Sequence, residues 1–247
     1  MPFDWLVAGL ATTGVGGLMT TRAGGCSEGR FASMNLQLGD ADDAAAVLHN
    51  RERLAQAVGA APVYLRQVHG TRVVRIGANE ARRGASVHEA DAAVTTEPGV
   101  ACTVLVADCL PVLFAAPEGR AVGAAHAGWR GLAAGVLEAS VTAVCKVGRC
   151  APAELTAWLG VSIGLTRFEV GADVVDAFGG ASPRFVAQGQ KKWLADLPGL
   201  AEERLRSAGV QHVSRSVGCT VDEPSRFFSY RRDGVTGRMA AAVWIER

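Results

Sequence analysis

A cysteine and a histidine stand in an otherwise apolar, glycine-punctuated stretch of the sequence. This stretch, VADCLPVLFAAPEGRAVGAAHAGWRG, runs from Val106 to Gly131 and contains Cys109 and His126. A thiolate and an imidazole can form a nucleophile with its base, or they can ligate one metal ion. A free cysteine and a histidine can also be ordinary packed side chains. The residue types alone therefore leave three interpretations open.

The spacing of the two residues becomes informative if the stretch between them forms a β-hairpin. A four-residue loop between Ala116 and Ala121 brings position 111 opposite His126. Cys109 then lies on the same face as His126, with Cβ atoms about 7 Å apart in a regular ladder. That separation is within reach of a single metal ion bridged by sulfur and nitrogen. The pattern permits a metal site without requiring one.

A metal site needs a third ligand, and the sequence contains five histidines. Three of them are more simply surface groups (His49, His88, His212). His69 differs, because it follows a strand-like run and precedes Gly70, where a strand end can present a side chain into a cleft. A lone histidine at a strand end is more often structural than ligating, and the spacing from His69 to Cys109 is no local metal motif. The residues by themselves therefore favour packing over metal binding.

The elements that must position these residues mix helices and strands without strict alternation. Helical spacing of apolar residues predicts helices over residues 43–58, 131–148, near 171–179 and over 193–209. Apolar runs predict strands over 100–107, 112–116, 121–127, near 155–164 and over 239–245, with two further strands hinged at His69–Gly70. This order predicts an α+β fold with mixed β-sheets flanked by helices. No linker or repeat divides the chain, so we expect a single domain over residues 1–247.

Composition narrows the class of protein. The 25 basic and 24 acidic residues give a formal net charge of +1, which argues against binding to nucleic acid or to anionic membranes. The six cysteines show no paired framework and are expected to be reduced thiols. The opening MPFDWLVAGLATTG lacks the regions of a signal peptide, and no run reaches the roughly 20 apolar residues of a spanning helix. We therefore expect a cytoplasmic protein without a membrane segment.

Several longer strings resemble the successive motifs of one family, in the family's order, from about Thr20 to Trp244. They are TTRAGGCSEGRFASMNLQLGD, RQVHGTRV, DAAVTTEPGVACTVLVADCLPVLFA, VGAAHAGWRGLAAGVLEA and CTVDEPSRFFSYRRDGVTGRMA. By these motifs the sequence is similar to the multicopper polyphenol oxidase, or laccase-domain, family, whose members are regarded as zinc-dependent purine nucleoside phosphorylases. The resemblance is specific for family membership and less specific for substrate.

The resemblance assigns the metal ligands to His69, Cys109 and His126, and this chain retains all three. Three nitrogen and sulfur ligands with an open fourth position are the pattern of a catalytic zinc site. Zinc would keep the thiolate deprotonated and lower the pKa of a bound water. Copper is the alternative metal. Asp108, next to Cys109, is either a carboxylate that supports the site or a turn cap.

One segment departs from the family pattern. Where members commonly read AIGPCCYEVG, this chain has SIGLTRFEVG, so Leu165-Thr166-Arg167 replaces the proline and the small or thiol residues. The change leaves the three ligands intact but puts the base preference and an auxiliary thiol in doubt. Cys219 matches the family's late CT motif, either as a functional or as a packed thiol.

Phosphorolysis requires an anion pocket beside the ribose, and two segments could supply it. Gly128-Trp129-Arg130-Gly131 leads into a helix, so we expect backbone N–H groups and Arg130 to hold phosphate near His126. Arg231, with Arg232 beside it, could complete this pocket. The alternative for these two arginines is a solvated basic turn paired with Asp233.

Other residues could contact the sugar or the base. Tyr230 could hydrogen-bond either, or pack over its turn, and Trp129 could stack on a purine, or pack under a loop. Ser33 and Asn35 are predicted to hold sugar hydroxyls, although both residue types also make ordinary turn bonds.

The resemblance implies phosphorolysis of adenosine, inosine and, as a further candidate, methylthioadenosine to free base and ribose 1-phosphate. His69, Cys109, His126 and Arg130 would be the catalytic residues. A zinc-activated water attacking C6 of adenosine would add an adenosine deaminase side activity. The alternatives are a copper-dependent polyphenol oxidase, a cysteine hydrolase acting on an amide of cell-wall precursors, and a non-enzymatic metal-binding module. We expect purine nucleoside and phosphate as ligands, and a monomer or small homo-oligomer.

Overall fold

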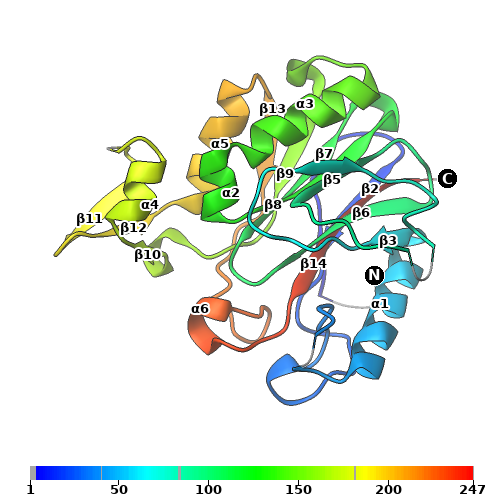
Figure 1. The fold of residues 1–247 in the computed structure, drawn as a ribbon, viewed down its shortest axis with the longest axis horizontal. Coiled ribbons are helices and arrows are strands. Elements are labelled where there is room, and N and C mark those ends of the chain that lie inside the picture. The colour runs from blue at the N-terminus through cyan, green and yellow to red at the C-terminus, as the bar shows by residue number, and fades with distance from the viewer. Residues whose placement is uncertain (1–3, 40, 83–84, 181, 247) are drawn as a thin grey trace.

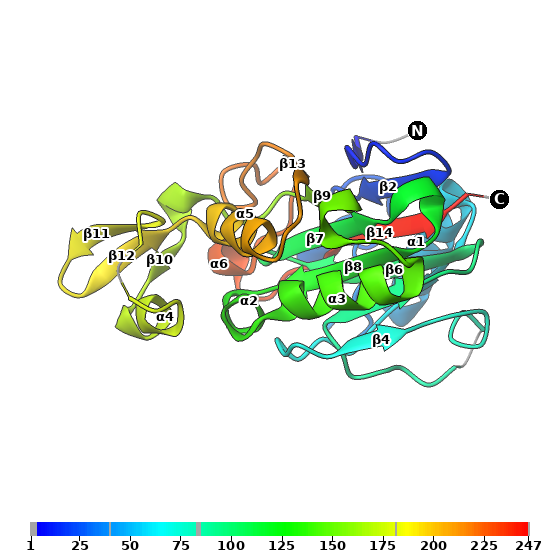
Figure 2. The ribbon, with the colours of Figure 1, turned by 90° about the horizontal axis from the view of Figure 1, so that it is seen from above.

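Two β-sheets face each other with helices on their outer sides, and a small third sheet projects from one end (Figures 1 and 2). The structure is a computed structural model, and it describes residues 4–39, 41–82, 85–180 and 182–246. The strand orders are β1-β2-β14-β6-β3 in the first sheet, β13-β9-β7-β8-β5-β4 in the second and β10-β12-β11 in the third. Parallel and antiparallel pairs occur together, so the expected α+β class with mixed sheets flanked by helices is confirmed.

The strands and helices have the following bounds. The first sheet contains β1 (Leu6–Val7), β2 (Val15–Met19), β14 (Met239–Ile245), β6 (Val100–Val106) and β3 (Ala61–Val63). The second contains β13 (His212–Arg215), β9 (Thr156–Leu159), β7 (Leu110–Ala115), β8 (Val122–Ala127), β5 (Ala92–Thr95) and β4 (Val73–Arg75). The third contains β10 (Glu169–Val170), β12 (Lys192–Ala195) and β11 (Phe185–Gly189). The helices are α1 (Ala44–Val58), α2 (Trp129–Ala134), α3 (Val136–Gly148), α4 (Ala172–Ala177), α5 (Leu197–Ser207) and α6 (Tyr230–Asp233).

The core lies in three apolar layers. Between the first two sheets, side chains such as Val104 of β6, Leu113 of β7 and Ala241 of β14 are fully buried. The other face of the second sheet packs on α3 and α5, and the outer face of the first sheet packs on α1. Because β6 and β7 are covered on both faces, their sequences are continuous apolar runs rather than alternating ones. β7 and β8 pair with Pro111 opposite His126, as the length of the loop predicts.

Three expected elements differ from the structure. The helix expected over residues 131–148 is divided into α2 and α3, because Gly135 adopts a left-handed conformation with a φ of 102° between them. The helix expected over 193–209 begins only at Leu197, since Asp196 caps it and the residues before it form β12. The strands expected about His69–Gly70 exist as β3 and β4 but belong to different sheets. The segment that carries His69 therefore crosses from one sheet to the other.

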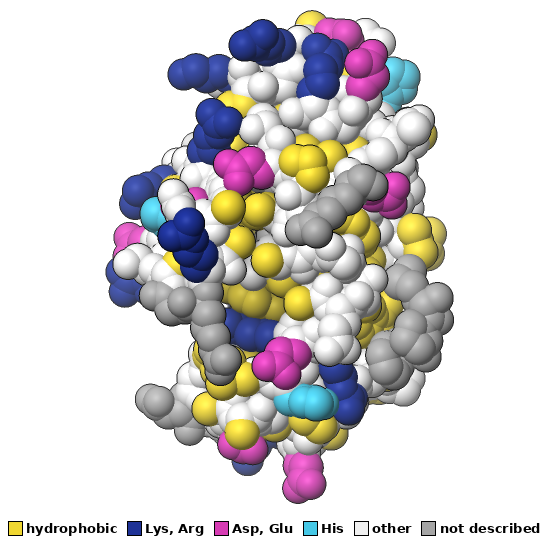
Figure 3. All heavy atoms as spheres, turned by 90° about the vertical axis from the view of Figure 1, so that its right-hand side faces the viewer, with side chains coloured by type: hydrophobic (Ala, Val, Ile, Leu, Met, Phe, Trp, Pro, Cys, Tyr) yellow, Lys and Arg dark blue, Asp and Glu magenta, His cyan; other side chains and the backbone are white. Residues whose placement is uncertain are grey.

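The surface agrees with the balanced charge of the sequence. On the face shown in Figure 3, cationic and anionic side chains are interspersed among neutral ones. Within the described ranges, no helix combines the length and the apolar character needed to cross a lipid bilayer.

α1 fixes the N-terminal loops through one fully buried side chain, that of Asn50. Its Nδ2 donates hydrogen bonds to the carbonyl oxygens of Ser33 and Asn35, each at 3.0 Å. Its Oδ1 accepts a hydrogen bond from the Cys26 N–H at 2.9 Å. The loops that contain the predicted sugar-binding residues are therefore held in place by α1.

We predict that Asn50→Ala lowers the free energy of unfolding by about 1–3 kcal/mol, because it leaves buried polar groups of these loops without partners. Asn79→Ala, at an exposed turn, is the matched control and should change stability by less than about 0.5 kcal/mol. Urea unfolding of both variants is the measurement. Equal stability of the two variants would contradict this role of Asn50.

Candidate metal centre

His69, Cys109 and His126 converge at one point although they come from three segments. These are the crossover between β3 and β4, the turn before β7, and β8. Their ligand atoms all lie within 4.8 Å of one another, and Cys109 Sγ is 3.8 Å from His69 Nε2. The His126 side chain is buried, whereas His69 is exposed. In the part of the chain that the structure describes, this is the one group of three such side chains that could hold a metal ion.

One buried carboxylate, that of Asp91, orients both histidines. Asp91 directly precedes β5 and is fully buried. Its Oδ1 accepts hydrogen bonds from His126 Nδ1 and from the His69 N–H, both at 2.9 Å. Its Oδ2 accepts from the N–H groups of Val68 at 3.1 Å and Gly70 at 2.7 Å. The bond to Nδ1 leaves Nε2 of His126 for a metal, and the backbone bonds hold His69 at a φ of 61°.

The charged groups of the site stabilise one another. Burial acts to raise the pKa of Asp91, but hydrogen bonds from His126 and the backbone outweigh it, and the pKa is lowered. Burial also acts to raise the pKa of Cys109, but the bonds and charges of His126 and His69 bring that pKa to about 6. Burial acts to lower the pKa of His126, yet its bonds to Asp91 and Cys109 raise it. At neutral pH the sulfur is therefore a thiolate, the form that a metal requires.

α2 can begin against the triad because residue 128 is glycine. A Cβ at Gly128 would lie 2.6 Å from His69 Cδ2 and 3.1 Å from Cys109 Sγ. A Cβ at Gly131 would lie 2.8 Å from the carbonyl oxygen of Gly70. The two glycines allow close approach of the first turn of α2 to the ligand segments.

The donor set fits a transition metal. Tetrahedral bonds of about 2.1 Å to nitrogen and 2.3 Å to sulfur separate these two atoms by about 3.6 Å. The observed separation of 3.8 Å between His69 Nε2 and Cys109 Sγ is close to that value. Two imidazoles and a thiolate suit zinc and also copper, so the residues define a site without selecting one metal. Three protein ligands leave a further position for water or substrate.

The triad lies in the wall of a cavity of about 730 Å³. Apolar side chains form much of the lining (Leu65, Leu105, Val106, Ile163, Phe168, Leu197). Four arginines also line it (Arg66, Arg130, Arg231, Arg238), whereas Asp108 is the one carboxylate among the described lining residues. An apolar cavity with a few convergent polar groups is typical of small-molecule sites. The excess of arginine favours an anionic ligand.

Three of the predicted binding residues, Arg130, Tyr230 and Arg231, lie in this lining. The exposed Arg130 guanidinium lies 4.3 Å from the centre of the Trp129 ring. Arg231 Nη1 donates a hydrogen bond to the Glu169 carbonyl oxygen at 3.1 Å. Tyr230 is 61% exposed, so its hydroxyl is accessible to a ligand.

Ser33 and Asn35 lie outside the lining, and their polar groups have protein partners. Ser33 Oγ accepts a hydrogen bond from the Gly25 N–H and donates one to the Arg22 carbonyl oxygen, both at 3.1 Å. Asn35 is 1% exposed, and its Oδ1 accepts from the Arg238 N–H at 2.9 Å. Contact of either side chain with a sugar stays a prediction.

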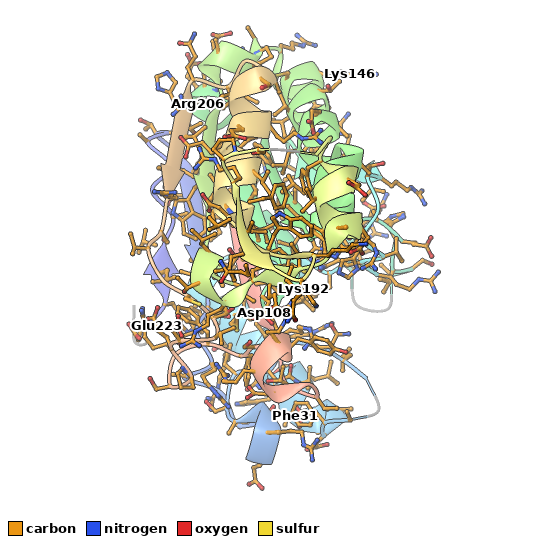
Figure 4. The ribbon with its side chains drawn as sticks, turned by 90° about the vertical axis from the view of Figure 1, so that its left-hand side faces the viewer. Phe31, Asp108, Lys146, Lys192, Arg206 and Glu223 are labelled. Carbon is orange, nitrogen blue, oxygen red and sulfur yellow. The ribbon has the colours of Figure 1, made fainter. Side chains whose placement is uncertain are left out.

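Asp108 bonds to the C-terminal segment rather than to the triad. Its Oδ1 accepts a hydrogen bond from the Thr220 hydroxyl at 2.5 Å, and its Oδ2 accepts from the Arg231 N–H at 2.6 Å. Figure 4 shows Asp108 directly above α6, the short helix that begins at Tyr230. Both bonds join Asp108 to residues remote in the chain, so they are not those of a local turn cap, and a role of Asp108 in support of the site stays a prediction.

Several residues of the site are absent from the sequence-based predictions, and two of them are central to its geometry. Asp91 holds the histidines, and Arg238 lines the cavity. Each is a charged residue directly before a buried apolar strand, β5 and β14 respectively. A lone charge at the start of such a strand is the signal that could have identified both.

The fold and the triad define a class of α+β proteins in which two histidines and one cysteine form a candidate metal site in a cavity wall. Residues 17–246 match the family model described as multi-copper polyphenol oxidoreductase laccase. The chain belongs to this laccase-domain family, and the family expected from the motifs is confirmed.

Relatives resemble the chain over nearly its whole length. The purine nucleoside phosphorylase PA4543 of Pseudomonas aeruginosa is 45% identical over 233 residues, 92% of each chain. The purine nucleoside phosphorylase YfiH of Escherichia coli is 44% identical over 239 residues, 94% of each chain. The crystal structure of the Neisseria meningitidis protein NMB0706 has a TM-score of 0.91 at 45% identity, over 99% of this chain and 100% of that one. YlmD from Geobacillus stearothermophilus has a TM-score of 0.92 at 33% identity, over 100% and 98%.

We predict that Asp91→Asn weakens zinc binding by about 10- to 100-fold, because a neutral amide holds the two histidine segments less firmly. The matched control is Asp222→Asn, which removes a carboxylate from the exposed ion pair with Arg167 and should leave zinc affinity unchanged. Competition with a chromophoric chelator measures the affinity. A folded Asp91→Asn protein with native zinc affinity would exclude this role.

The lowered pKa of Cys109 predicts the pH dependence of its reactivity. In metal-free protein the thiolate persists until the pH falls through about 6, so alkylation by iodoacetamide should be half-maximal near that pH. His126→Ala removes a partner of the thiolate and should move the midpoint upward. Mass spectrometry of the Cys109 peptide is the measurement, and added zinc should protect it. A native midpoint at the ordinary cysteine value of about 8.5 would refute the interaction.

Proposed function

We propose that this protein is a metal-dependent purine nucleoside phosphorylase. In the reaction a phosphate oxygen forms a bond to C1′ of the ribose, the bond from C1′ to the purine nitrogen breaks, and the base leaves with a proton. Two curated relatives that bear this name support the class of reaction. The proposal depends above all on one observation, the triad in the wall of a cavity lined by four arginines and one carboxylate.

We assign the metal to His69, Cys109 and His126, with zinc as the favoured ion and copper as the alternative. Zinc, when bound, supplies a Lewis acid that polarises the substrate group beside it. The chain's own contribution is to fix the geometry. Asp91 holds both imidazoles in place, and the low pKa of Cys109 keeps the sulfur deprotonated at neutral pH.

We assign the nucleoside and the phosphate to different parts of the lining. Apolar residues such as Phe168 offer a surface for the purine, and the exposed Tyr230 hydroxyl can bond to ribose or base. Arg130, as a further catalytic residue, and Arg231 supply positive charge for phosphate. Ser33 and Asn35, predicted to hold the sugar, lie behind this lining.

Adenosine, inosine and methylthioadenosine are the proposed substrates, and deamination of adenosine at C6 is a proposed side activity of the same centre. A copper-dependent phenol oxidase would need several linked copper centres. The described part of the chain offers one group of three candidate ligands, which favours single-metal chemistry. A cysteine hydrolase would use the Cys109 thiolate as its nucleophile and would not need the metal. A monomer or small homo-oligomer in the cytoplasm stays our expectation.

We predict that metal-analysed protein converts adenosine to adenine and ribose 1-phosphate only when phosphate is present. Cys109→Ala removes a ligand and should lower the rate by at least about 100-fold, because the metal then loses its place beside the substrate. Cys150→Ala, a partly exposed thiol at the far end of α3, is the matched control and should keep the native rate. Chromatography and mass spectrometry identify the products.

Other products would replace the proposal. If inosine and ammonia were the products and no phosphate were needed, the protein would be a deaminase and not a phosphorylase. Phenol-dependent oxygen uptake by copper-loaded protein would indicate an oxidase. Turnover of an amide that survives chelation and stops on alkylation of Cys109 would indicate a hydrolase.

A further inference from the structure

Arg238 is held rigidly in the lining of the cavity that contains the triad. Its N–H donates to Asn35 Oδ1 at 2.9 Å, and its carbonyl oxygen accepts from the Leu36 N–H at 3.2 Å. Its Nη1 donates to the carbonyl oxygens of Thr236 at 2.9 Å and Gly237 at 3.1 Å. The backbone and one arm of the guanidinium are therefore fixed before any ligand arrives.

The other arm of this guanidinium lacks a protein acceptor. Among the residues that the structure describes, none accepts a hydrogen bond from Nε or Nη2 of Arg238, and none forms an ion pair with it. The side chain as a whole is partly buried, and its guanidinium lies 5.9 Å from the centre of the Tyr230 ring. Parallel donors of a guanidinium match two oxygens of a phosphate. The open arm is thus a preformed pair of hydrogen-bond donors for an oxyanion.

The other arginines of the lining are engaged differently. Arg66 is paired with Glu89. Arg130 is exposed and stacks on its neighbour Trp129. Arg231 reaches away to the carbonyl oxygens of residues 167 and 169 and lies over the Phe168 ring. Among the four lining arginines, Arg238 is therefore the one that combines a partly buried side chain with guanidinium donors that lack a protein acceptor among the described residues.

Arg238 also lies within electrostatic reach of the candidate ligand Cys109. Burial lowers the pKa of Arg238, while the charges of Cys109, Asp108 and Tyr230 act in the opposite direction. The guanidinium stays protonated at neutral pH, as arginine does in proteins. Arg238 and the triad line the same cavity.

We propose that Arg238 anchors the phosphate co-substrate through Nε and Nη2, which rests on the proposed phosphorolysis. Arg130 and Arg231 then supply secondary charge at the rim. Asn35 acts through Arg238 as a positioning residue, since its Oδ1 holds the Arg238 backbone.

Equilibrium binding of inorganic phosphate to metal-analysed protein tests the assignment by calorimetry. Arg238→Gln should weaken phosphate binding by about 10- to 100-fold, the loss expected for charge-assisted hydrogen bonds, and Arg238→Lys by less. The KM for phosphate should rise similarly, while the KM for adenosine should change by less than about threefold. Arg120→Gln is the matched control, because Arg120 also donates to backbone carbonyls but lies in the turn at the opposite end of β7. Phosphate affinity in Arg238→Gln equal to that of the native protein overturns the proposal.

A second measurement uses the native protein and does not depend on the folding of a variant. Phosphate should protect Arg238 from modification by phenylglyoxal, whereas Arg120 should react at the same rate with and without phosphate. Equal modification of Arg238 under both conditions overturns the assignment. Arg238-dependent phosphate binding without formation of ribose 1-phosphate would support the anion site while refuting the phosphorylase. Phosphate-dependent turnover that Arg238→Gln leaves unchanged would support the phosphorylase while refuting the anion site at Arg238.

Discussion

The candidate centre depends on one buried anion, because Asp91 bonds to the segments of two of the three ligands. Burying a carboxylate is costly unless donors replace its lost water. Here three consecutive backbone N–H groups, of residues 68–70, and one imidazole take that place. The same bonds that stabilise the charge also curl the loop so that His69 faces His126. Stability and site geometry are therefore supplied by one interaction.

The two facing sheets bring the third candidate ligand, Cys109, beside the two histidines that Asp91 holds. Cys109 and His126 lie at the open end of the β7–β8 hairpin, away from its turn, on the face that packs against the first sheet. His69 lies on the segment that crosses between the two sheets. The cavity opens where β6 ends and β7 begins. Because both sheets are covered on their outer faces, polar groups can gather at these strand ends without interrupting the apolar core.

Some of these features could be predicted from the sequence, because they depend on residues that are close together in the chain. The loop length after Ala116 sets the register of β7 and β8, so the shared face of Cys109 and His126 follows from it. His69 lies on a crossover between the sheets, and residue spacing does not reveal such a long-range relation. His69 was predicted as a ligand only from the family motif in which it stands. The break at Gly135 was missed because apolar spacing continues across it from Leu132 to Val136. Trp193 entered an expected helix, because the β11–β12 hairpin that contains it was not predicted. Asp91 and Arg238 each stand as a lone charge before a buried strand, but their partners His126 and Asn35 are remote in the chain, so the sequence does not reveal what they bond to.

Asp108 connects the candidate ligand Cys109 to two C-terminal segments that lie far from it in the chain. One carboxylate oxygen is joined to Thr220 and the other to the first turn of α6, while the next residue along the chain is the sulfur donor Cys109. A molecule that displaces the first turn of α6 would act on Asp108 through the hydrogen bond from the Arg231 N–H. The wall of the cavity formed by α6 and the candidate ligand Cys109 are therefore joined through a single residue, Asp108.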